Sequence, residues 1–154
     1  MIVVSDTSSV SALLRIGKCD LLRRLYREVV IPEAVKTELL FAFSNLPEYL
    51  HCEKVLQRSN VERLQMELDI GEAEAIVLAR EKHADMLLID EKRGRQAAIR
   101  EGIPIIGLVG VLLLAKGNGF ISSVRELINR LEIEADFRLS DQLKHNAFEQ
   151  AGEL

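Results

Sequence analysis

Two short apolar runs, each followed directly by an aspartate, constrain most strongly how this chain of 154 residues can fold. Asp6 follows the run at residues 2–5, and Asp90 follows the run at residues 86–89. Short apolar runs that end in a polar residue indicate buried strands of a parallel sheet. Ligands of open α/β sheets bind beyond the carboxyl ends of the strands, so we expect both aspartates at one such edge.

Helical segments alternate with these strands along the chain. Further strands are predicted at residues 29–31 and 103–106, whereas residues 43–55 indicate no clear structure. Helices are predicted over residues 7–16, 20–27, 32–42, 59–68, 72–82, 91–100, 108–116, 122–131 and 140–150. Such alternation predicts an α/β fold in which helices cover a parallel sheet and right-handed crossovers join the strands.

Several helix starts have recognisable capping residues. Thr7, Ser8 or Ser9 can cap the first helix, and Ser59 or Asn60 can cap the helix that runs to residue 68. Pro32 is expected to open the helix after the strand at residues 29–31, because the first helical position needs no N–H donor.

Length and composition indicate one compact domain over residues 1–154, with a helical C-terminal extension from about residue 120. A chain of this size buries roughly two-thirds of the surface that it exposes when unfolded. The two cysteines form no zinc-binding pattern, no signal peptide precedes the first strand, and the apolar stretch at residues 103–115 is too short to span a bilayer. We therefore expect a cytoplasmic protein without a membrane segment.

The charge distribution is uneven. The net charge of -4 argues against indiscriminate binding of polyanions, which commonly requires a basic excess. Local basic clusters nevertheless occur near the first helices and directly after Asp90, where Lys92, Arg93 and Arg95 follow one another closely. Each of these cations could simply belong to a solvated helix face.

Four acidic residues are candidates for one site, namely Asp6, Glu38, Glu72 and Asp90. Carboxylates that gather at a sheet edge repel one another and have raised pKa values unless a divalent cation neutralises them. Each residue alone also has a structural explanation, because Asp6 and Asp90 could cap the helices that follow and Glu38 could be a surface glutamate. The combination favours a metal site.

Glu72 is the most ambiguous of the four. Asp69 and Glu72 have the spacing of a capping box, so Glu72 could serve only to satisfy backbone donors at a helix start. Glu74 lies two residues further on, and side chains at that spacing point roughly 200° apart on a helix. Only one of Glu72 and Glu74 can therefore face a small site.

These residues lie in motifs that resemble the PIN-domain nucleases. The resemblance rests on residues 6–8 behind the first strand, residues 31–35 leading to Glu38, residues 71–76, and residues 88–91 leading to Arg95. It is closest to a prokaryotic subgroup similar to the toxins of type II toxin-antitoxin pairs. The resemblance implies a three-layer α/β/α fold with a central, mostly parallel sheet of four to five strands.

The resemblance also implies particular roles for residues. By position, the acidic residues that hold Mg²⁺ or Mn²⁺ in that family match Asp6, Glu38, Glu72 and Asp90, with Ser8, Glu74 and Glu91 as supporting or alternate groups. Family members generally cleave RNA, and are often homodimers whose site is blocked by a small antitoxin protein. An activated water would then attack phosphorus and leave a 5′-phosphate and a 3′-hydroxyl. Backbone phosphates are expected to contact Lys92, Arg93 and Arg95.

Other functional classes fit less well. A phosphatase of the haloacid-dehalogenase type needs a second aspartate where this chain has Ser8, and a receiver domain needs an aspartate after residues 29–31. A non-catalytic PIN-like module that binds RNA or a protein stays open. Helical residues after 120 could belong to the core or to a partner interface, and residues 137–154 have few apolar anchors, so they could dock onto a second subunit or fray.

Overall fold

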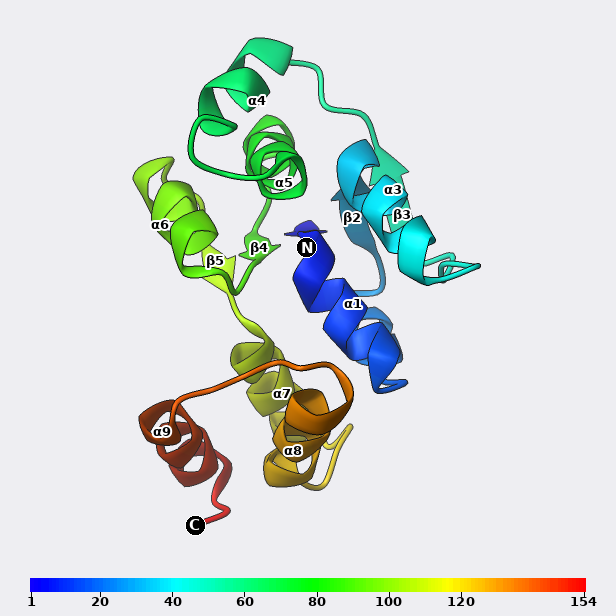
Figure 1. Ribbon diagram of the computed structural model, residues 1–154. Coiled ribbons are helices and arrows are strands. Elements are labelled where there is room, and N and C mark those ends of the chain that lie inside the picture. The colour runs from blue at the N-terminus through cyan, green and yellow to red at the C-terminus, as the bar shows by residue number, and fades with distance from the viewer.

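A sheet of five parallel strands forms the centre of the computed structural model, which describes all residues 1–154 (Figure 1). The strand order is β3-β2-β1-β4-β5, and every neighbouring pair is parallel. The strands are β1 (Val3–Ser5), β2 (Val29–Pro32), β3 (Leu50–Glu53), β4 (Met86–Leu88) and β5 (Ile105–Ile106). The prediction of an α/β fold with a mostly parallel sheet of four to five strands is confirmed.

The central strand β1 lies at the point where the strand order reverses. Val4 is in register with Val30 of β2 on one side and with Leu87 of β4 on the other. After β1 the chain forms β2 and β3 on one side of that strand, and it then returns to form β4 and β5 on the other side. The crossovers therefore diverge between β1 and β4. In doubly wound sheets this divergence opens a crevice beyond the carboxyl ends of the two strands.

Helices cover both faces of the sheet, as expected for three layers (Figure 1). Alternate residues of β1 point to opposite faces, so Val3 belongs to one hydrophobic core and Val4 to the other. The larger core includes side chains of α1 (Thr7–Arg15), α2 (Asp20–Tyr26), α3 (Glu33–Ala42), α7 (Leu108–Gly117), α8 (Val124–Glu134) and α9 (Asp141–Ala151). The smaller core includes side chains of α4 (Arg58–Leu64), α5 (Ile70–Glu81) and α6 (Lys92–Arg100).

The strand β3 has no counterpart in the sequence prediction. It forms the outer edge of the sheet beside β2, and Leu50 is its only buried residue. An edge strand does not need the continuous apolar run that marks a strand covered on both faces. The pattern of residues 43–55 therefore gave no indication of it.

Several predicted helix starts were wrong in detail. Of the candidates for the start of α1, Asp6 is the N-cap, as one of the open alternatives had it, and Thr7, Ser8 and Ser9 are not. The helix predicted from Ser59 or Asn60 to residue 68 runs instead over Arg58–Leu64, with Gln57 as an N-cap whose side chain makes no capping bond. Pro32 is the N-cap of α3, one residue before the first helical position.

The C-terminal helix α9 packs against α7 and α8 of its own chain. Ala147 and Phe148 are buried, and the guanidinium of Arg125 lies 4.0 Å from the centroid of the Phe148 ring. The carboxylate of Glu153 accepts hydrogen bonds from the backbone N–H groups of Val124 and Arg125 at the start of α8. Residues 137–154 thus pack within their own chain, through α9 and Glu153. None of the helices combines the length and apolar character that crossing a bilayer requires.

Candidate functional site

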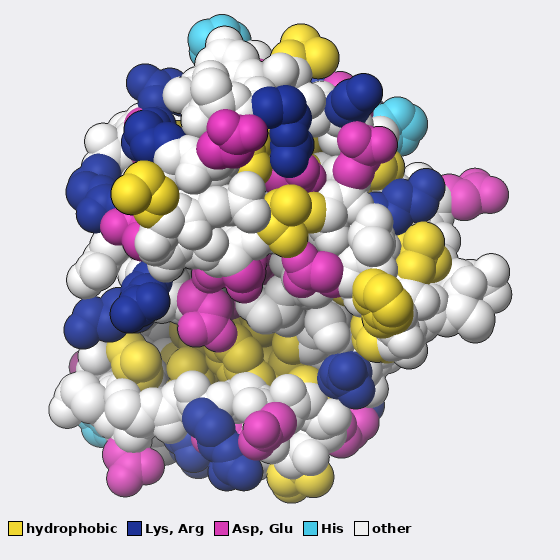
Figure 2. All heavy atoms as spheres, turned by 45° about the horizontal axis from the view of Figure 1, so that its top comes forward, with side chains coloured by type: hydrophobic (Ala, Val, Ile, Leu, Met, Phe, Trp, Pro, Cys, Tyr) yellow, Lys and Arg dark blue, Asp and Glu magenta, His cyan; other side chains and the backbone are white.

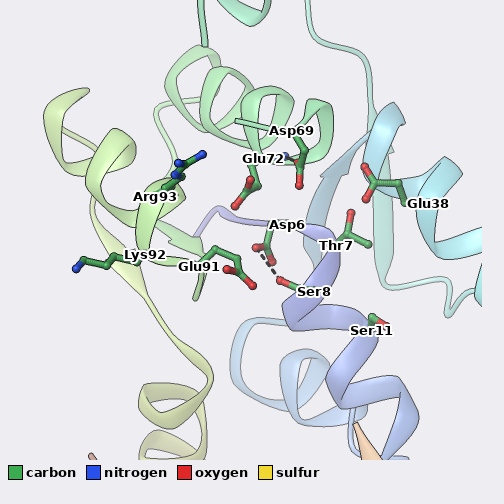
Figure 3. A pocket seen from close by; sticks show the side chains of 10 residues that line it. All are labelled: Asp6, Thr7, Ser8, Ser11, Glu38, Asp69, Glu72, Glu91, Lys92 and Arg93. Atoms are coloured by element: carbon green, nitrogen blue, oxygen red, sulfur yellow. Dashed lines mark hydrogen bonds between the residues drawn. The ribbon is translucent and has the colours of Figure 1, made fainter. Parts of the chain in front are cut away.

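A polar cavity of about 540 Å³ opens beyond the carboxyl ends of β1 and β4. None of its lining residues is hydrophobic. Figure 3 shows the side chains that line it, which are Asp6, Thr7, Ser8, Ser11, Glu38, Asp69, Glu72, Glu91, Lys92 and Arg93. In the space-filling view of Figure 2, several acidic side chains gather in the middle of this face, above a hollow whose floor is hydrophobic. The cavity lies where the divergence of the crossovers predicts a ligand site.

Asp6 lies at the bottom of this site and is only 1% exposed. Its Oδ1 accepts a hydrogen bond of 3.1 Å from the backbone N–H of Ser9, and its Oδ2 accepts one of 3.2 Å from the Ser8 hydroxyl. Burial raises the pKa of Asp6 to about 7, and the nearby charge of Asp90 adds to the increase, while the bonds from Ser9 and Ser8 oppose it. The sequence left open whether Asp6 caps a helix or belongs to the site. In the structure it does both, because it is the N-cap of α1 and also lines the cavity.

Asp90 is joined to Asp6 through one serine. The Ser9 hydroxyl donates a hydrogen bond of 3.1 Å to Asp90 Oδ2, while its backbone N–H donates to Asp6. The backbone N–H of Leu108 also donates to both carboxylate oxygens of Asp90, at 3.2 and 3.1 Å. A Cβ built on Gly107, the N-cap of α7, would lie 2.6 Å from Asp90 Oδ1. Asp90 therefore caps α7 and lies behind the lining residues, not among them.

Glu38 and Glu72 reach the cavity from α3 and α5. Asp69 is the N-cap of α5 and accepts a hydrogen bond of 2.8 Å from the backbone N–H of Glu72. The carboxylate of Glu72 points into the cavity (Figure 3). Burial, and then the charge of Asp69, raises the pKa of Glu72 to about 7, and burial also raises the pKa of Glu38.

Two glycines allow these carboxylates to approach the neighbouring helices. A Cβ built on Gly71 would lie 2.5 Å from Glu38 Oε1, and one built on Gly94 would lie 2.9 Å from Glu72 Oε2. Real Cβ atoms essentially never come within 3.0 Å of such atoms. Any larger residue at either glycine would displace the facing carboxylate.

Besides Asp90, two residues that the sequence associated with the site do not line the cavity. Glu74 is buried, and its carboxylate accepts hydrogen bonds from the backbone N–H of Ala34 at 2.9 Å and from Arg58 Nη1 at 2.5 Å. Arg95 donates from Nη1 to the carbonyl oxygen of Ile89 at 2.9 Å. This bond uses one of the N–H groups of its guanidinium, and the phosphate contact of Arg95 stays a prediction.

Three predicted residues from the start of α6 do line the cavity. Figure 3 shows the Glu91 carboxylate directed toward Ser8, whereas the side chain of Lys92 extends away from the centre of the cavity. Arg93 lies on the side of the cavity formed by Glu72. Cations are therefore present at one rim of an otherwise acidic site.

Sequence reasoning did not assign Thr7, Ser11 or Asp69 to the site, although all three line the cavity. Thr7 and Ser11 are four residues apart on α1 and so lie on one face of that helix. Their spacing was a usable indication, because it continues a polar face beside Asp6, while Val10 and residues 12–14 are apolar. Asp69 was interpreted only as a capping residue, and nothing in the sequence indicates where the start of α5 points.

The donor set of the cavity consists of carboxylate and hydroxyl oxygens, which are the ligands that hard cations such as Mg²⁺ prefer. No group of three or more His, Cys, Asp or Glu side chains is arranged so that it could hold a metal ion. The expected cluster of four ligands is thus not assembled, although its members lie at one end of the sheet. Mg²⁺ commonly uses one or two carboxylates and keeps several waters, so the chemistry of the donors fits such an ion.

A parallel α/β/α fold with an acidic cavity at its switch point fits a nuclease-type domain. Residues 2–153 match a family model described as a PIN domain, and the chain therefore belongs to the PIN-domain family. The resemblance to PIN domains that the sequence indicates is confirmed. PIN domains are generally nucleases and usually use divalent metals. No curated protein matches the chain.

Proposed function

We propose that this protein is a metal-dependent endoribonuclease that uses Mg²⁺ or Mn²⁺. One observation carries the proposal, namely a cavity without hydrophobic lining into which five carboxylates project, from Asp6, Glu38, Asp69, Glu72 and Glu91. Like charges that gather in one cavity are unfavourable unless a cation neutralises them. Burial, and then the charges of neighbouring carboxylates, raise the pKa values of Asp6 and Glu72.

Phosphodiester groups are the substrate class that suits this site. A phosphate would be repelled by the carboxylates alone, so its entry requires a cation between the two sets of negative charges. Lys92 and Arg93 at the rim can contact flanking phosphates without selecting a base. No aromatic side chain lines the cavity, so the site favours contacts to phosphate and sugar over base stacking.

The chain's own residues would hold the reacting groups in place. Asp6, Glu38 and Glu72 would hold the metal ion directly or through water, and Asp90, which lies behind the cavity, would support Asp6 through Ser9. A bound Mg²⁺ or Mn²⁺ would supply the Lewis acidity that activates a water and neutralises charge on the leaving oxygen. Water adds to phosphorus, the P–O3′ bond breaks, and O3′ takes up a proton, which leaves a 5′-phosphate and a 3′-hydroxyl.

The biological setting that we propose is a toxin-antitoxin pair in the cytoplasm. This part rests on the resemblance to the prokaryotic toxin subgroup, in which a small antitoxin protein blocks the site of a homodimer. We further propose that residues 1–154 act as one domain, since α7, α8 and α9 share a hydrophobic core with α1 and α2. The helices after residue 120 are then a part of that domain.

The test compares the purified protein with Asp6→Asn on structured and single-stranded RNA, with Mg²⁺, with Mn²⁺ and with EDTA. Asp141→Asn is the matched control, because Asp141 lies in the first turn of α9, outside the cavity. We expect cleavage that needs the metal, survives Asp141→Asn and is lost in Asp6→Asn. Equal cleavage by the wild type and Asp6→Asn, or cleavage in EDTA, would refute the proposal.

A further inference from the structure

We infer that Glu74 is a positioning residue, which caps α3 from the neighbouring helix α5 and thereby holds Glu38 at the cavity. The inference rests on the proposed function, because it assigns Glu38 a role at the metal. Glu74 itself lines no part of the cavity. Its effect would pass through the backbone of α3.

The start of α3 lacks a capping group of its own. Its N-cap is Pro32, which makes no side-chain capping bond. The first N–H groups of a helix have no partner within the helix and favour a negative charge nearby. Glu74 Oε1 supplies the missing acceptor for the N–H of Ala34 at 2.9 Å, across 40 positions of sequence.

The carboxylate of Glu74 is fixed on both of its oxygens. Oε2 accepts a hydrogen bond from Arg58 Nη1 at 2.5 Å, while Oε1 accepts from Ala34. Glu74 is only 4% exposed, and a buried carboxylate is tolerated only when it is paired and hydrogen-bonded. Glu74 therefore connects the starts of α3 and α4 to α5, and α3 and α5 lie side by side in Figure 1.

Two pairs of contacting residues, one helical turn apart, join α3 and α5. Ala34 and Glu38 are four residues apart on α3, and Gly71 and Glu74 are three residues apart on α5, so each pair lies along one face of its helix. In the first pair Glu74 accepts a hydrogen bond from Ala34, and in the second Glu38 lies against Gly71. Because the two pairs are one helical turn apart, the bond between Glu74 and Ala34 fixes the position of the Glu38 carboxylate.

The test uses Glu74→Ala and Glu74→Gln in the full chain. Glutamine retains an acceptor for the Ala34 N–H, whereas alanine removes it. Glu81→Ala is the matched control, because Glu81 also lies on α5 and accepts from backbone N–H groups, at Leu56 and Gln57, but does not contact α3. Two quantities are measured, the Mn²⁺ concentration that half-saturates thermal stabilisation and the hydrogen exchange of the Ala34 amide.

We expect Glu74→Ala to raise the half-saturating Mn²⁺ concentration about tenfold and to accelerate exchange at Ala34, in line with the effect of removing groups that orient metal ligands. Glu74→Gln should retain most of the protection and the affinity. Glu81→Ala should lose stability without a change in Mn²⁺ affinity. If Glu74→Ala binds Mn²⁺ as Glu81→Ala does, the inference is overturned while the proposed function stands. If the wild type shows no Mn²⁺ stabilisation, both fail.

Discussion

Replacing Asp6 by asparagine should stabilise the metal-free protein while it abolishes activity. Asparagine has nearly the shape of aspartate and is an equally good N-cap, so it can still accept the hydrogen bond from the Ser9 N–H. The substitution removes a negative charge from a side chain that is 1% exposed. The substitution therefore removes the free-energy cost of burying that charge.

The magnitude follows from the pKa of Asp6. Folding raises this pKa from 3.8 to about 7, so the folded state binds the proton more tightly than the unfolded state. Stability is therefore greatest below the unfolded pKa and falls as the pH rises through about 7. A shift of about three units corresponds to about 4 kcal/mol, which is the largest difference that we expect between Asp6→Asn and the wild type at about pH 8.

Urea denaturation in EDTA measures this difference between about pH 4 and pH 8. The two proteins should be almost equally stable at the acidic end, and Asp6→Asn should become the more stable one as the pH rises. Mn²⁺ should then stabilise the wild type much more than the variant. A variant that is less stable than the wild type at about pH 8 would refute the reasoning, because burial of the charge would not be the dominant effect.

Three further predictions concern other parts of the structure. Gly71→Ala should lower the cleavage rate about tenfold or more, because its Cβ would lie 2.5 Å from a carboxylate oxygen of the site, and single-turnover assays would measure this. Glu153→Ala should lower the free energy of unfolding by about 2–4 kcal/mol at neutral pH, as measured in urea. The wild-type pKa of Glu153 is lowered to about 2 by hydrogen bonds from Lys116 and from the start of α8, which outweigh its burial, so this contribution should be lost as the pH falls from 4.5 toward 2. Arg93→Ala should weaken RNA binding and reduce the slope of log K against log salt by about one, as measured by fluorescence anisotropy.

Two of these predictions have a matched control within the chain. Gly117→Ala introduces a Cβ with nothing within 4 Å, so it should leave cleavage unchanged. Arg138→Ala removes an exposed arginine whose partner Asp136 is also exposed, and it should not alter the salt dependence. Equal effects of Gly71→Ala and Gly117→Ala on cleavage, or of Arg93→Ala and Arg138→Ala on the salt dependence, would contradict the placement of the site. A Glu153 variant as stable as the wild type would contradict the proposed anchoring of the C-terminus.

The strands at the centre of the sheet were predictable because they are covered on both faces. The runs that end before Asp6 and Asp90 must be apolar on both sides, and β1 and β4 are indeed neighbours. The edge strand Leu50–Glu53 was not predictable, because only one of its four residues is buried. The sequence therefore indicated the middle of the sheet better than its edge.

Helix capping was the weakest part of the prediction because capping groups can come from distant segments. Sequence patterns consider only neighbours, such as Ser59 at the start of α4. In the structure the carboxylates of Glu74 and Asp90 cap α3 and α7, which are far from them in sequence. Such partners become visible only once the helices have packed.

The amino-acid sequence alone determined the class of the fold and the family, because burial on both faces requires apolar strands and a parallel sheet requires crossovers between them. It also determined that Asp6 and Asp90 lie beyond the carboxyl ends of two strands, at the same end of the sheet. Only the tertiary structure decided that Glu72 faces the cavity, that Glu74 faces α3, and that Asp69 joins the site. These assignments depend on the rotation and spacing of packed helices, which sequence periodicity leaves undetermined.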